Sequence, residues 1–419
     1  MNEPTKLPIG RNTALLSAAL AANSATLQLA AAVATITFAL VVEIEGLLGL
    51  GPAIVLGTGA LAALPAGRAM DRFGRIPVLA VGFGLGVAGG LLTALGSATE
   101  SPAALVPGLL GVGVAGGMAL LARTAAGDMY PPARRARGIA LVLFGAVFGA
   151  ILGPAVFSPL LSGRDLDGDA LAVPWIAAAG FMLVGLVLVL LVRPDPKRIA
   201  ELISPAATVA GVAELRPVAA PLRELLQRPG VIPSLLAAVA SFSVMVGVMT
   251  LTGYVVVEEH GHAGHTVFPI IGAHVFGMYA LVLVVGDLID RIGRTPSLAA
   301  GLAVMAVSVV SLLWITSVPA TAVALFGLGL GWNLSFVAAT AQLADCTAPH
   351  ERGKLLGFND LLSGLTGAGL ALLGGYALTA LGVTALALGG TALVLLPALW
   401  ITRFGRRGSP AEAAPSTLE

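Results

Sequence analysis

The sequence predicts an all-α polytopic membrane protein, with twelve transmembrane helices in two pseudo-symmetric bundles of six. Two observations support this prediction: the composition, and one motif that recurs in the second half. Of the 419 residues, 57% are hydrophobic and only 11% are charged, with a mean hydropathy of +0.95. Soluble domains carry about 25% charged residues. The chain therefore lacks the charge to cover a surface in water, and its single Cys excludes a disulfide scaffold.

Long stretches without Asp, Glu, Lys or Arg locate the helices. A bilayer core of about 30 Å needs about 20 apolar residues per helix. Eight stretches each provide one helix, at 12–42, 46–67, 76–99, 101–122, 138–163, 170–192, 229–257 and 266–286. Two longer stretches, 295–344 and 355–402, each provide two helices. We expect the first to break at 316–319, where polar residues and a Pro predict a turn, and the second near Gly382.

The Lys and Arg residues predict the topology. Of the 23 Lys and Arg residues, 21 fall in the two tails and in the loops of one side, and the exceptions are Arg123 and Arg164. Loops rich in Lys and Arg stay in the cytoplasm. We therefore expect a multi-pass protein of the cell inner (plasma) membrane with both termini cytoplasmic. The acids of the opposite face are Glu43, Glu45, Glu100, Asp165, Asp167, Asp169, Glu258 and Glu259.

The spacing of the helices predicts the domain organisation. An N-terminal six-helix bundle covers 1–192, and a cytoplasmic linker loop covers 193–228, with an amphipathic piece expected near 222–226. A C-terminal six-helix bundle covers 229–404. We expect a disordered cytoplasmic tail at 405–419, because exposed polar chain ends are seldom ordered.

An internal repeat supports the two-bundle organisation. The run 67–77 (GRAMDRFGRIP) recurs at 286–296 (GDLIDRIGRTP), with each matched residue 219 positions further on. A second, weaker repeat pairs 128–138 with 345–353. Such duplication is typical of secondary transporters, whose substrate sites lie between the halves near the bilayer midplane.

The G-x-x-x-D-R-x-G-R run resembles motif A of the major facilitator superfamily, and its second copy stands in the expected loop between helices 8 and 9. The resemblance covers residues 12–404. It implies that family's fold, and transport of a small molecule by alternating access as the two halves rock.

The resemblance also implies a conformational latch. In the family, the Asp and Arg of motif A join an acid at the inner end of helix 4, here Asp128, and hold the outward-facing state. The residues themselves indicate that Gly67 and Gly74 allow a tight turn and that Asp71 can pair with Arg72 or Arg75. The alternative is that the arginines only anchor the topology. The expected latch residues are Gly67, Asp71, Arg72, Gly74, Arg75, Asp128, Asp290 and Arg294.

Helix 5 carries a Gly at every fourth position, in the order Gly145, Gly149 and Gly153, followed by Pro154. The pattern resembles motif C of drug/proton antiporters in the family, although no Gly pair follows. It favours export. The alternative is ordinary close packing of helices, which small residues four apart permit.

The resemblance implies that helices 1, 4, 7 and 10 line a central cavity. Polar residues inside a membrane are costly, and each is therefore a functional candidate. The cavity candidates are Asn23, Gln28, Arg123, Tyr254, Trp332, Asn333 and Gln342. For Arg123, the alternative is a side chain that extends to the interface or pairs with the latch acids. The R-x-x-Q-G pattern of many drug exchangers is missing from helix 4, where 107–111 reads PGLLG.

Proton coupling requires a titratable group inside the membrane, and Asp360 and His274 are the candidates. For Asp360 the alternative is a helix-end acid favoured by the helix dipole. For His274 it is a packing residue. In the loop before helix 8, His260, His262 and His265 are a candidate for a metal site, with a polar outer loop as the alternative.

We expect a transporter rather than an enzyme, with proton-coupled efflux of small organic compounds as the main hypothesis. Uptake of a metabolite, or metal-linked export through the His-rich loop, is the alternative within transport. A polytopic protein without transport is the alternative outside it. The Gly-rich runs lack the Lys-Ser/Thr ending of a phosphate loop, and no cofactor is expected. The expected partners are a small-molecule substrate, protons and the lipid bilayer, without nucleic acid, for a monomer.

Overall fold

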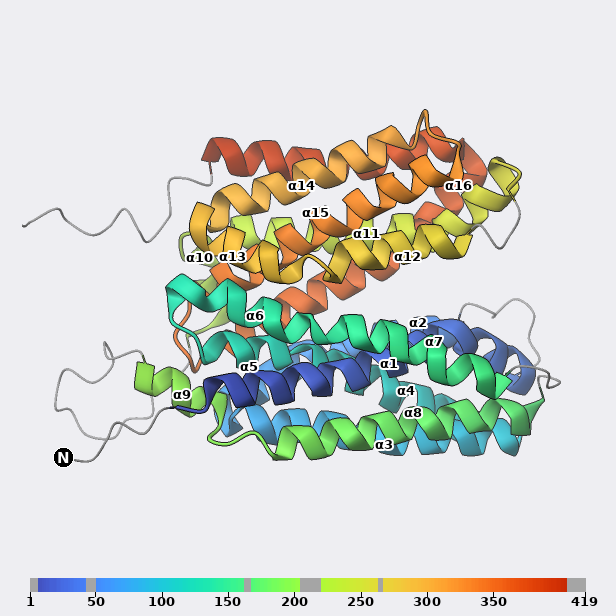
Figure 1. The fold of residues 1–419 in the computed structure, drawn as a ribbon, viewed down its shortest axis with the longest axis horizontal. Coiled ribbons are helices and arrows are strands. Elements are labelled where there is room, and N and C mark those ends of the chain that lie inside the picture. Colours follow the sequence, from blue (N-terminus) through green and yellow to red (C-terminus); the bar gives the residue numbers. More distant parts are fainter. Residues whose placement is uncertain (1–6, 43–49, 162–166, 204–219, 263–266, 405–419) are drawn as a thin grey trace, which may run out of the picture. The chain divides into compact units, whose positions relative to one another are not determined.

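The computed structural model describes residues 7–42, 50–161, 167–203, 220–262 and 267–404, and every regular element in these ranges is helical (Figure 1). Among them, ten segments are long and apolar enough to cross a membrane. A pair bent by 40°, Pro269–Tyr279 with Val282–Ile292, supplies an eleventh. Helix α16 (Arg352–Phe404) is broken at Gly382, and its first half is a further long helix before the break. The predicted fold class is confirmed.

The chain folds into two compact units. The first comprises Met1–Pro131 and Leu141–Pro217, and the second comprises Pro132–Ala140 and Val218–Glu419. The nine residues 132–140 pack with the second unit, although they lie in the first half of the sequence. The tail 405–419 and most of the linker, 204–219, lie outside the described residues.

In the first unit, α3 packs against both α4 and α8, and α1 packs against α7 and α8. Figure 1 shows α3 and α8 running side by side. A core around Leu109 and Trp175 is formed mainly by α1, α4 and α8, and Trp175 Nε1 donates to Thr37 Oγ1 at 3.1 Å. The helices are α1 (Ile9–Val42), α2 (Leu50–Phe73), α3 (Arg75–Ala98), α4 (Pro102–Leu120), α5 (Ala122–Asp128), α7 (Gly145–Leu161), α8 (Gly168–Leu190) and α9 (Pro196–Ile203).

In the second unit, α15 packs against α11, α12 and α14, while α16 packs against α11 and α14. A helix that spans both units, α6 (Arg135–Leu143), begins within this one. The other elements are η2 (Pro132–Arg134), α10 (Leu222–Gln227), α11 (Val231–Tyr254), η4 (Val255–Glu259), α12 (Val267–Tyr279), α13 (Val282–Ile292), α14 (Arg294–Ser311) and α15 (Val318–Asp345).

The helix breaks follow from the residues at them. Gly74 separates α2 from α3 with φ at 99°, and Gly293 separates α13 from α14 with φ at 92°. Positive φ is costly for any residue with a Cβ, and Gly is the residue that adopts it readily. Gly382 breaks α16 in the same way, with φ at 80°. The predicted breaks at 316–319 and near Gly382 are both confirmed.

Large apolar side chains remain on the surface of both units. Leu61 is 58% exposed, Val307 68% and Leu396 65%. Exposed apolar area of this extent would drive aggregation in water, whereas hydrocarbon tails solvate it. The exposed faces of these helices are therefore the lipid-facing ones, and the candidate sites lie at the buried polar positions.

Candidate latch and transport site

The first unit brings Asp71, Arg75 and Asp128 together at one end of α2, α3 and α5. Arg75 is fully buried, and its Nε donates to Asp128 Oδ2 at 2.6 Å. Its Nη1 donates to Asp71 Oδ1 at 3.1 Å and to the carbonyl of Met70 at 2.9 Å. A buried cation is tolerated only when paired. One guanidinium therefore joins three helix ends.

The start of the linker closes this cluster. Asp195 Oδ2 accepts from the backbone N–H of Ile76 at 2.9 Å, in the first turn of α3. Its Oδ1 accepts from the N–H of Lys197 at 2.8 Å, in the first turn of α9. Carboxylates are favourable at helix N-termini, where N–H groups lack partners. Lys197 Nζ also donates to the carbonyl of Asp71. α9 is therefore attached to the motif A turn itself.

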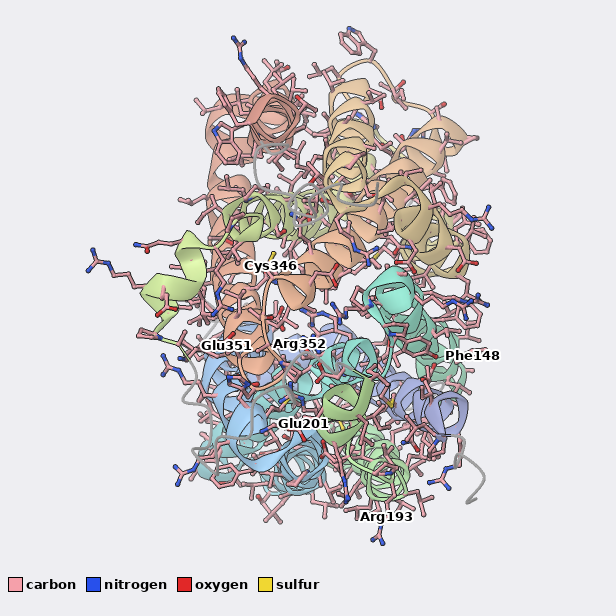
Figure 2. The ribbon with its side chains drawn as sticks, turned by 90° about the vertical axis from the view of Figure 1, so that its left-hand side faces the viewer. Phe148, Arg193, Glu201, Cys346, Glu351 and Arg352 are labelled. Atoms are coloured by element: carbon pink, nitrogen blue, oxygen red, sulfur yellow. The ribbon has the colours of Figure 1, made fainter. Side chains whose placement is uncertain are left out.

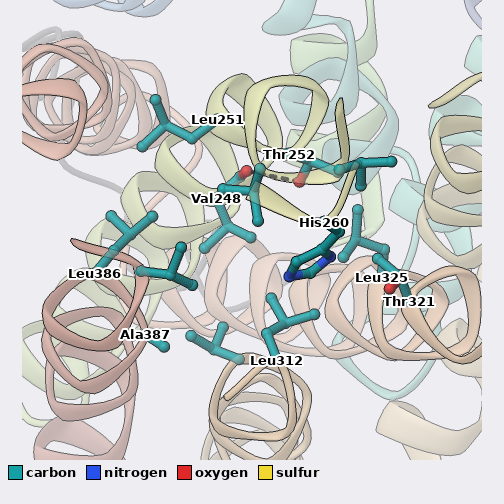
Figure 3. Close-up of a pocket in the computed structure, with 13 residues that line it drawn as sticks. Val248, Leu251, Thr252, His260, Leu312, Thr321, Leu325, Leu386 and Ala387 are labelled. Carbon is teal, nitrogen blue, oxygen red and sulfur yellow. Dashed lines mark hydrogen bonds between the residues drawn. The ribbon is translucent and has the colours of Figure 1, made fainter. Parts of the chain in front are cut away.

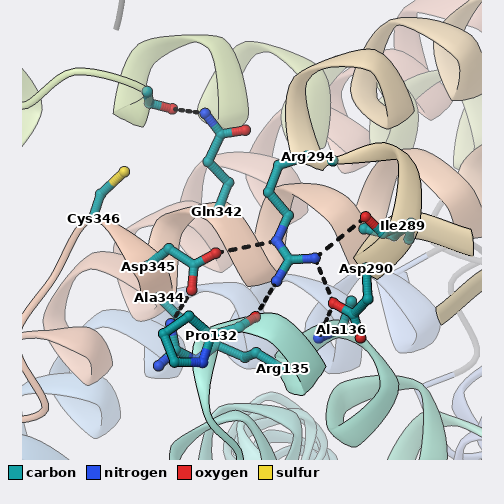
Figure 4. A network of polar contacts seen from close by, with 12 residues as sticks. Pro132, Arg135, Ala136, Ile289, Asp290, Arg294, Gln342, Ala344, Asp345 and Cys346 are labelled. Carbon is teal, nitrogen blue, oxygen red and sulfur yellow. Dashed lines mark hydrogen bonds and ion pairs between the residues drawn. The ribbon is translucent and has the colours of Figure 1, made fainter. Parts of the chain in front are cut away.

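The second unit repeats the cluster (Figure 4). Arg294 Nη1 donates to Asp290 Oδ1 at 2.5 Å and to the carbonyl of Ile289 at 3.4 Å, and Nε donates to Asp345 Oδ2 at 3.1 Å. Ile289, Asp290 and Arg294 are the repeats of Met70, Asp71 and Arg75. Asp345 is the first residue of the second copy of the weaker repeat, and Asp128 is the first residue of the first copy. The duplicated sequence thus produces a duplicated geometry.

Residues 132–140 complete the second cluster. Asp290 accepts hydrogen bonds from the backbone N–H of Ala136 at 3.3 Å and of Arg137 at 3.1 Å, in the first turn of α6. Arg294 Nη2 donates to the carbonyl of Pro132 at 2.6 Å, and Arg135 pairs with Asp345. The repeated motif A therefore binds the start of α6 in the second unit.

The structure distinguishes Arg72 from the other expected latch residues. Arg72 is exposed, and its guanidinium lies 5.0 Å from the centre of the Phe73 ring. Its neighbour Arg75 makes the ion pairs. Asp195, Arg135 and Asp345 are not among the predicted residues. Asp345 could have been predicted as a cluster residue, because it stands at the position of Asp128 in the weaker repeat. No sequence pattern indicates Asp195.

The end of the linker docks on the second unit. Leu225 of α10 is fully buried beside Leu343 and Leu355. Arg228 donates two hydrogen bonds to Glu351, from Nη1 to Oε2 at 2.6 Å and from Nη2 to Oε1 at 3.0 Å. The amphipathic piece predicted near 222–226 forms the short helix α10.

Glu351 and Cys346, both labelled in Figure 2, have perturbed acidities. Burial by itself raises the pKa of Glu351, but hydrogen bonds from Arg228 and from the N–H groups of Ala348 and Ala220 outweigh it and lower the pKa to about 2. Burial raises the pKa of the Cys346 thiol to about 11, and Asp345 adds to this effect. Glu351 is therefore a strong anion, while Cys346 is a weakly acidic thiol.

The Gly stripe of helix 5 packs α7 against α1. A Cβ at Gly145 would lie 2.0 Å from the carbonyl oxygen of Ser17, and one at Gly149 would lie 2.3 Å from that of Ala21. Neither position admits a side chain. Gly153 faces the Cβ of Gln28 at 3.1 Å. The side chain of Pro154 lies outside the described residues. Close packing of α7 and α1 accounts for the pattern locally, and an additional role in exchange stays a prediction.

Two of the cavity candidates in the first unit are deeply buried. Asn23 is 2% exposed, and its Oδ1 has no hydrogen-bond partner among the described residues. Arg123 is fully buried at the start of α5, and its Nη1 donates to the carbonyl of Leu120 at 3.2 Å. Gln28 is half-buried on α1. A buried amide without a partner costs free energy unless water or a ligand satisfies it.

In the second unit, α15 carries an aromatic and amide cluster. The rings of Trp332 and Phe336 are stacked 4.8 Å apart, and Tyr279 meets Trp332 edge-on at 6.1 Å. Within the described residues, no hydrogen-bond partner is found for Trp332 Nε1, for either amide atom of Asn333 or for Gln342 Oε1. Gln342 Nε2 donates to the carbonyl of Gly230 at 3.3 Å. The side chain of Tyr254 lies outside the described residues.

The two proton-coupling candidates are both buried. His274 Nδ1 donates to the carbonyl of Leu325 at 3.0 Å, and its Nε2 has no partner among the described residues. Asp360 is 8% exposed and accepts from Asn359 Nδ2 at 3.2 Å. Because α16 begins at Arg352, Asp360 lies more than two turns inside the helix. The dipole of a helix N-terminus fades within one turn, and it does not account for this acid.

The described histidines of the His-rich loop do not converge on one site. His262 Nε2 donates to the carbonyl of Thr316 at 2.7 Å, and the His260 and His262 rings stand 6.3 Å apart, edge to face. His265 lies outside the described residues. In the part of the chain that the structure describes, no three His, Cys, Asp or Glu side chains form a group able to hold a metal ion.

Two helical units with the same Asp-Arg-Asp cluster, and with buried polar residues between lipid-facing surfaces, define a secondary transporter of the membrane. A family model described as Major Facilitator Superfamily matches residues 12–273 and 256–418. The chain belongs to the major facilitator superfamily. It is a multi-pass transporter of small molecules and not an enzyme.

Two curated bacterial relatives are similar over most of the chain. The "Uncharacterized MFS-type transporter YdeG" of Bacillus subtilis is 32% identical over 82% of this chain and 83% of its own. The "Riboflavin transporter RfnT" of Brucella anthropi is 33% identical over 84% of this chain and 86% of its own. Among solved structures, the proton:xylose symporter XylE is 16% identical, covers 95% of this chain and 96% of its own, and has a TM-score of 0.75. This last likeness shows the fold alone.

Proposed function

We propose that the protein is a proton-coupled exporter of small organic compounds that carry a planar ring and amide-like hydrogen-bonding groups. The α15 cluster is the observation that supports this most directly. A stacked Trp332–Phe336 pair suits a planar ring. The unpartnered amide of Asn333 suits a substrate with both donors and acceptors. A site built to hydrogen-bond its substrate discriminates strongly against analogues without those groups.

Three features support proton coupling and export. His274 donates through Nδ1, and its Nε2 remains available as a proton acceptor among the described residues. Asp360 is a second buried titratable group on α16. The Gly145–Gly153 stripe resembles the exchangers' motif C. We place the protein in the plasma membrane as a monomer with both termini in the cytoplasm.

Uptake of a flavin-like metabolite is a second candidate. The similarity to a protein named riboflavin transporter favours it. An isoalloxazine ring and its imide would match the same aromatic and amide groups of α15. The two candidates share a ligand chemistry and differ in direction.

Flux in proteoliposomes tests both candidates. Protein is reconstituted with radiolabelled riboflavin as the first probe, followed by a panel of planar heterocycles, with a pH gradient of either sign or none. Exchange of inward protons for outward substrate supports the main proposal, and accumulation of substrate together with inward protons supports uptake. A flux that is the same with and without the pH gradient contradicts proton coupling. Wild-type flux by Asn333→Leu contradicts the α15 site.

A further inference from the structure

The outer end of the second unit contains a pocket that includes none of the latch residues and none of the Trp332, Phe336 and Asn333 side chains. It lies among α11, η4, α14, α15 and the second half of α16. The space open to the centre of a water molecule is about 40 Å³, a narrow channel, and the whole empty volume with the solvent at its mouth is about 490 Å³. Figure 3 shows the aliphatic side chains around it, with the ring of His260 turned into the space. Every described lining residue belongs to the second unit.

The walls are aliphatic. Val, Leu and Ala side chains supply most of the surface, and Leu325 and Ala387 are almost fully buried. Two lining hydroxyls are already satisfied by their own helices. Thr252 donates to the carbonyl of Val248 at 2.8 Å, and Thr321 donates to that of Ser317 at 3.0 Å. Among the described lining residues, no carboxylate, ammonium or guanidinium is present.

His260 is the exception to these apolar walls. Its Nδ1 is shielded from solvent and has no hydrogen-bond partner among the described residues. A buried polar atom without a partner costs free energy, which a ligand that bonds to it would recover. The neighbouring His262 is bonded to Thr316 and is not among the lining residues.

The backbone before His260 sets the direction of this side chain. Val255–Glu259 is a π-helical turn, and the N–H of His260 donates to the carbonyl of Val255 at 3.0 Å, five residues back. A π turn contains one residue more than an α turn, and thus rotates the following side chains by about 100° around the axis. Such turns are rare in proteins as a whole and frequent at functional sites.

We propose that this pocket binds a single-chain aliphatic carboxylic acid, with the chain between α11, α15 and α16 and the carboxyl group on His260 Nδ1. The aliphatic walls suit a flexible chain better than a planar ring, because no described lining residue apart from His260 is aromatic. A carboxyl group can bond to an imidazole whichever partner carries the proton. The acid can enter from the outer solution or from the bilayer, and the chemistry is the same.

Photo-crosslinking tests the site in the full-length protein, held in lipid nanodiscs so that detergent chains do not compete. A diazirine-labelled decanoic acid is activated, and the labelled peptides are identified by mass spectrometry. We expect labels in 248–260 and 383–387. Decanoate should compete about tenfold better than methyl decanoate, because loss of a charge-assisted hydrogen bond has an effect of this size. Equal competition by acid and ester, or labels confined to other peptides, would overturn the proposal.

Matched variants separate binding from folding. His260→Ala should remove the preference for the acid over the ester, whereas His262→Ala should keep it. Ala387→Leu, which fills the pocket, should abolish labelling while the protein keeps its wild-type Tm. Undiminished labelling of a folded Ala387→Leu variant would overturn the proposal. Labelling without free acid in solution, from decanoic acid placed in the bilayer, identifies the membrane as the source.

Discussion

The Nε of Arg75 donates to Asp128 Oδ2 at 2.6 Å, and the repeat of this pair is Arg294 with Asp345 at 3.1 Å. The two clusters share their geometry and differ in burial. The side chain of Arg75 is inaccessible to solvent, whereas that of Arg294 is 14% exposed and that of Asp345 is 19% exposed. The first cluster is therefore the one in which loss of a partner is most costly.

We expect Asp128→Asn to abolish most transport and to lower the Tm strongly. Removal of one partner of a buried ion pair typically costs about 3–5 kcal/mol, since the remaining charge stays buried. Asp71→Asn should cut transport and leave membrane insertion intact. Flux in proteoliposomes and thermal unfolding in detergent measure both effects. Arg72→Gln is the control and should behave as wild type, because Arg72 is exposed. Full transport by Asp71→Asn would refute the latch role.

Asp345→Asn should destabilise the protein less than Asp128→Asn does. Both arginines keep a second acid, Asp71 for Arg75 and Asp290 for Arg294, but only Arg294 is partly exposed, so that water can solvate it. A transport defect with a small change in Tm is the expected result. Equal losses of Tm in the two variants would show that the exposure of the second cluster has no energetic consequence.

Gly149→Leu should lower the Tm and impair transport, since even a Cβ at this position would lie 2.3 Å from the carbonyl oxygen of Ala21. Overpacking of this kind costs about 1–3 kcal/mol or more. Gly84→Leu is the matched control. Gly84 lies in α3, and a Cβ added there would have no other heavy atom within 4 Å. A normal Tm for Gly149→Leu would contradict the close packing of α7 on α1.

Acid should release the linker end from the second unit. The folded-state pKa of Glu351 is about 2, below the ordinary value, and the stability that its ionisation contributes is present above about pH 4.5. That contribution declines as the pH falls from about 4.5 towards 2. Thermal unfolding between pH 6 and pH 2.5 measures it. Glu351→Gln should lose this part of the pH dependence, and Glu201→Gln, on an exposed position of α9, should retain it.

Cys346 should react slowly with maleimides at neutral pH. Burial raises the pKa of its thiol to about 11, which leaves little thiolate at pH 7. It is the only Cys of the chain, and the labelling rate reports on this site alone. The charge of Arg228 lowers the pKa of the thiol, but Arg228 also bonds to Glu351 and to the carbonyl of Cys346 and holds the linker over the thiol. We expect Arg228→Ala to accelerate labelling, because the gain in exposure outweighs the lost charge. An unchanged rate would show that the linker does not protect the thiol.

The fold was predictable because its signals are local. Runs of apolar residues mark the helices, and flanking Lys and Arg predict their orientation. Gly74 and Gly382 interrupt helices where the sequence suggested turns. Residues 132–140 are different. They lie within the N-terminal half of the sequence, yet they pack with the second unit, because Asp290 binds the first turn of α6. No local pattern predicts that contact.

The sequence by itself determined the helices, their repeat and the Asp71–Arg75 motif, since these depend on hydropathy and on spacing along one chain. Only the tertiary structure decided which carboxylates meet the arginines. Asp195 and Asp345 join the clusters because helices distant in sequence end at the same place. The direction of the His260 side chain was likewise decided by the π-helical turn at Val255–Glu259. The residue types in this segment do not predict such a turn. Partners depend on three-dimensional position, whereas helices depend on local composition.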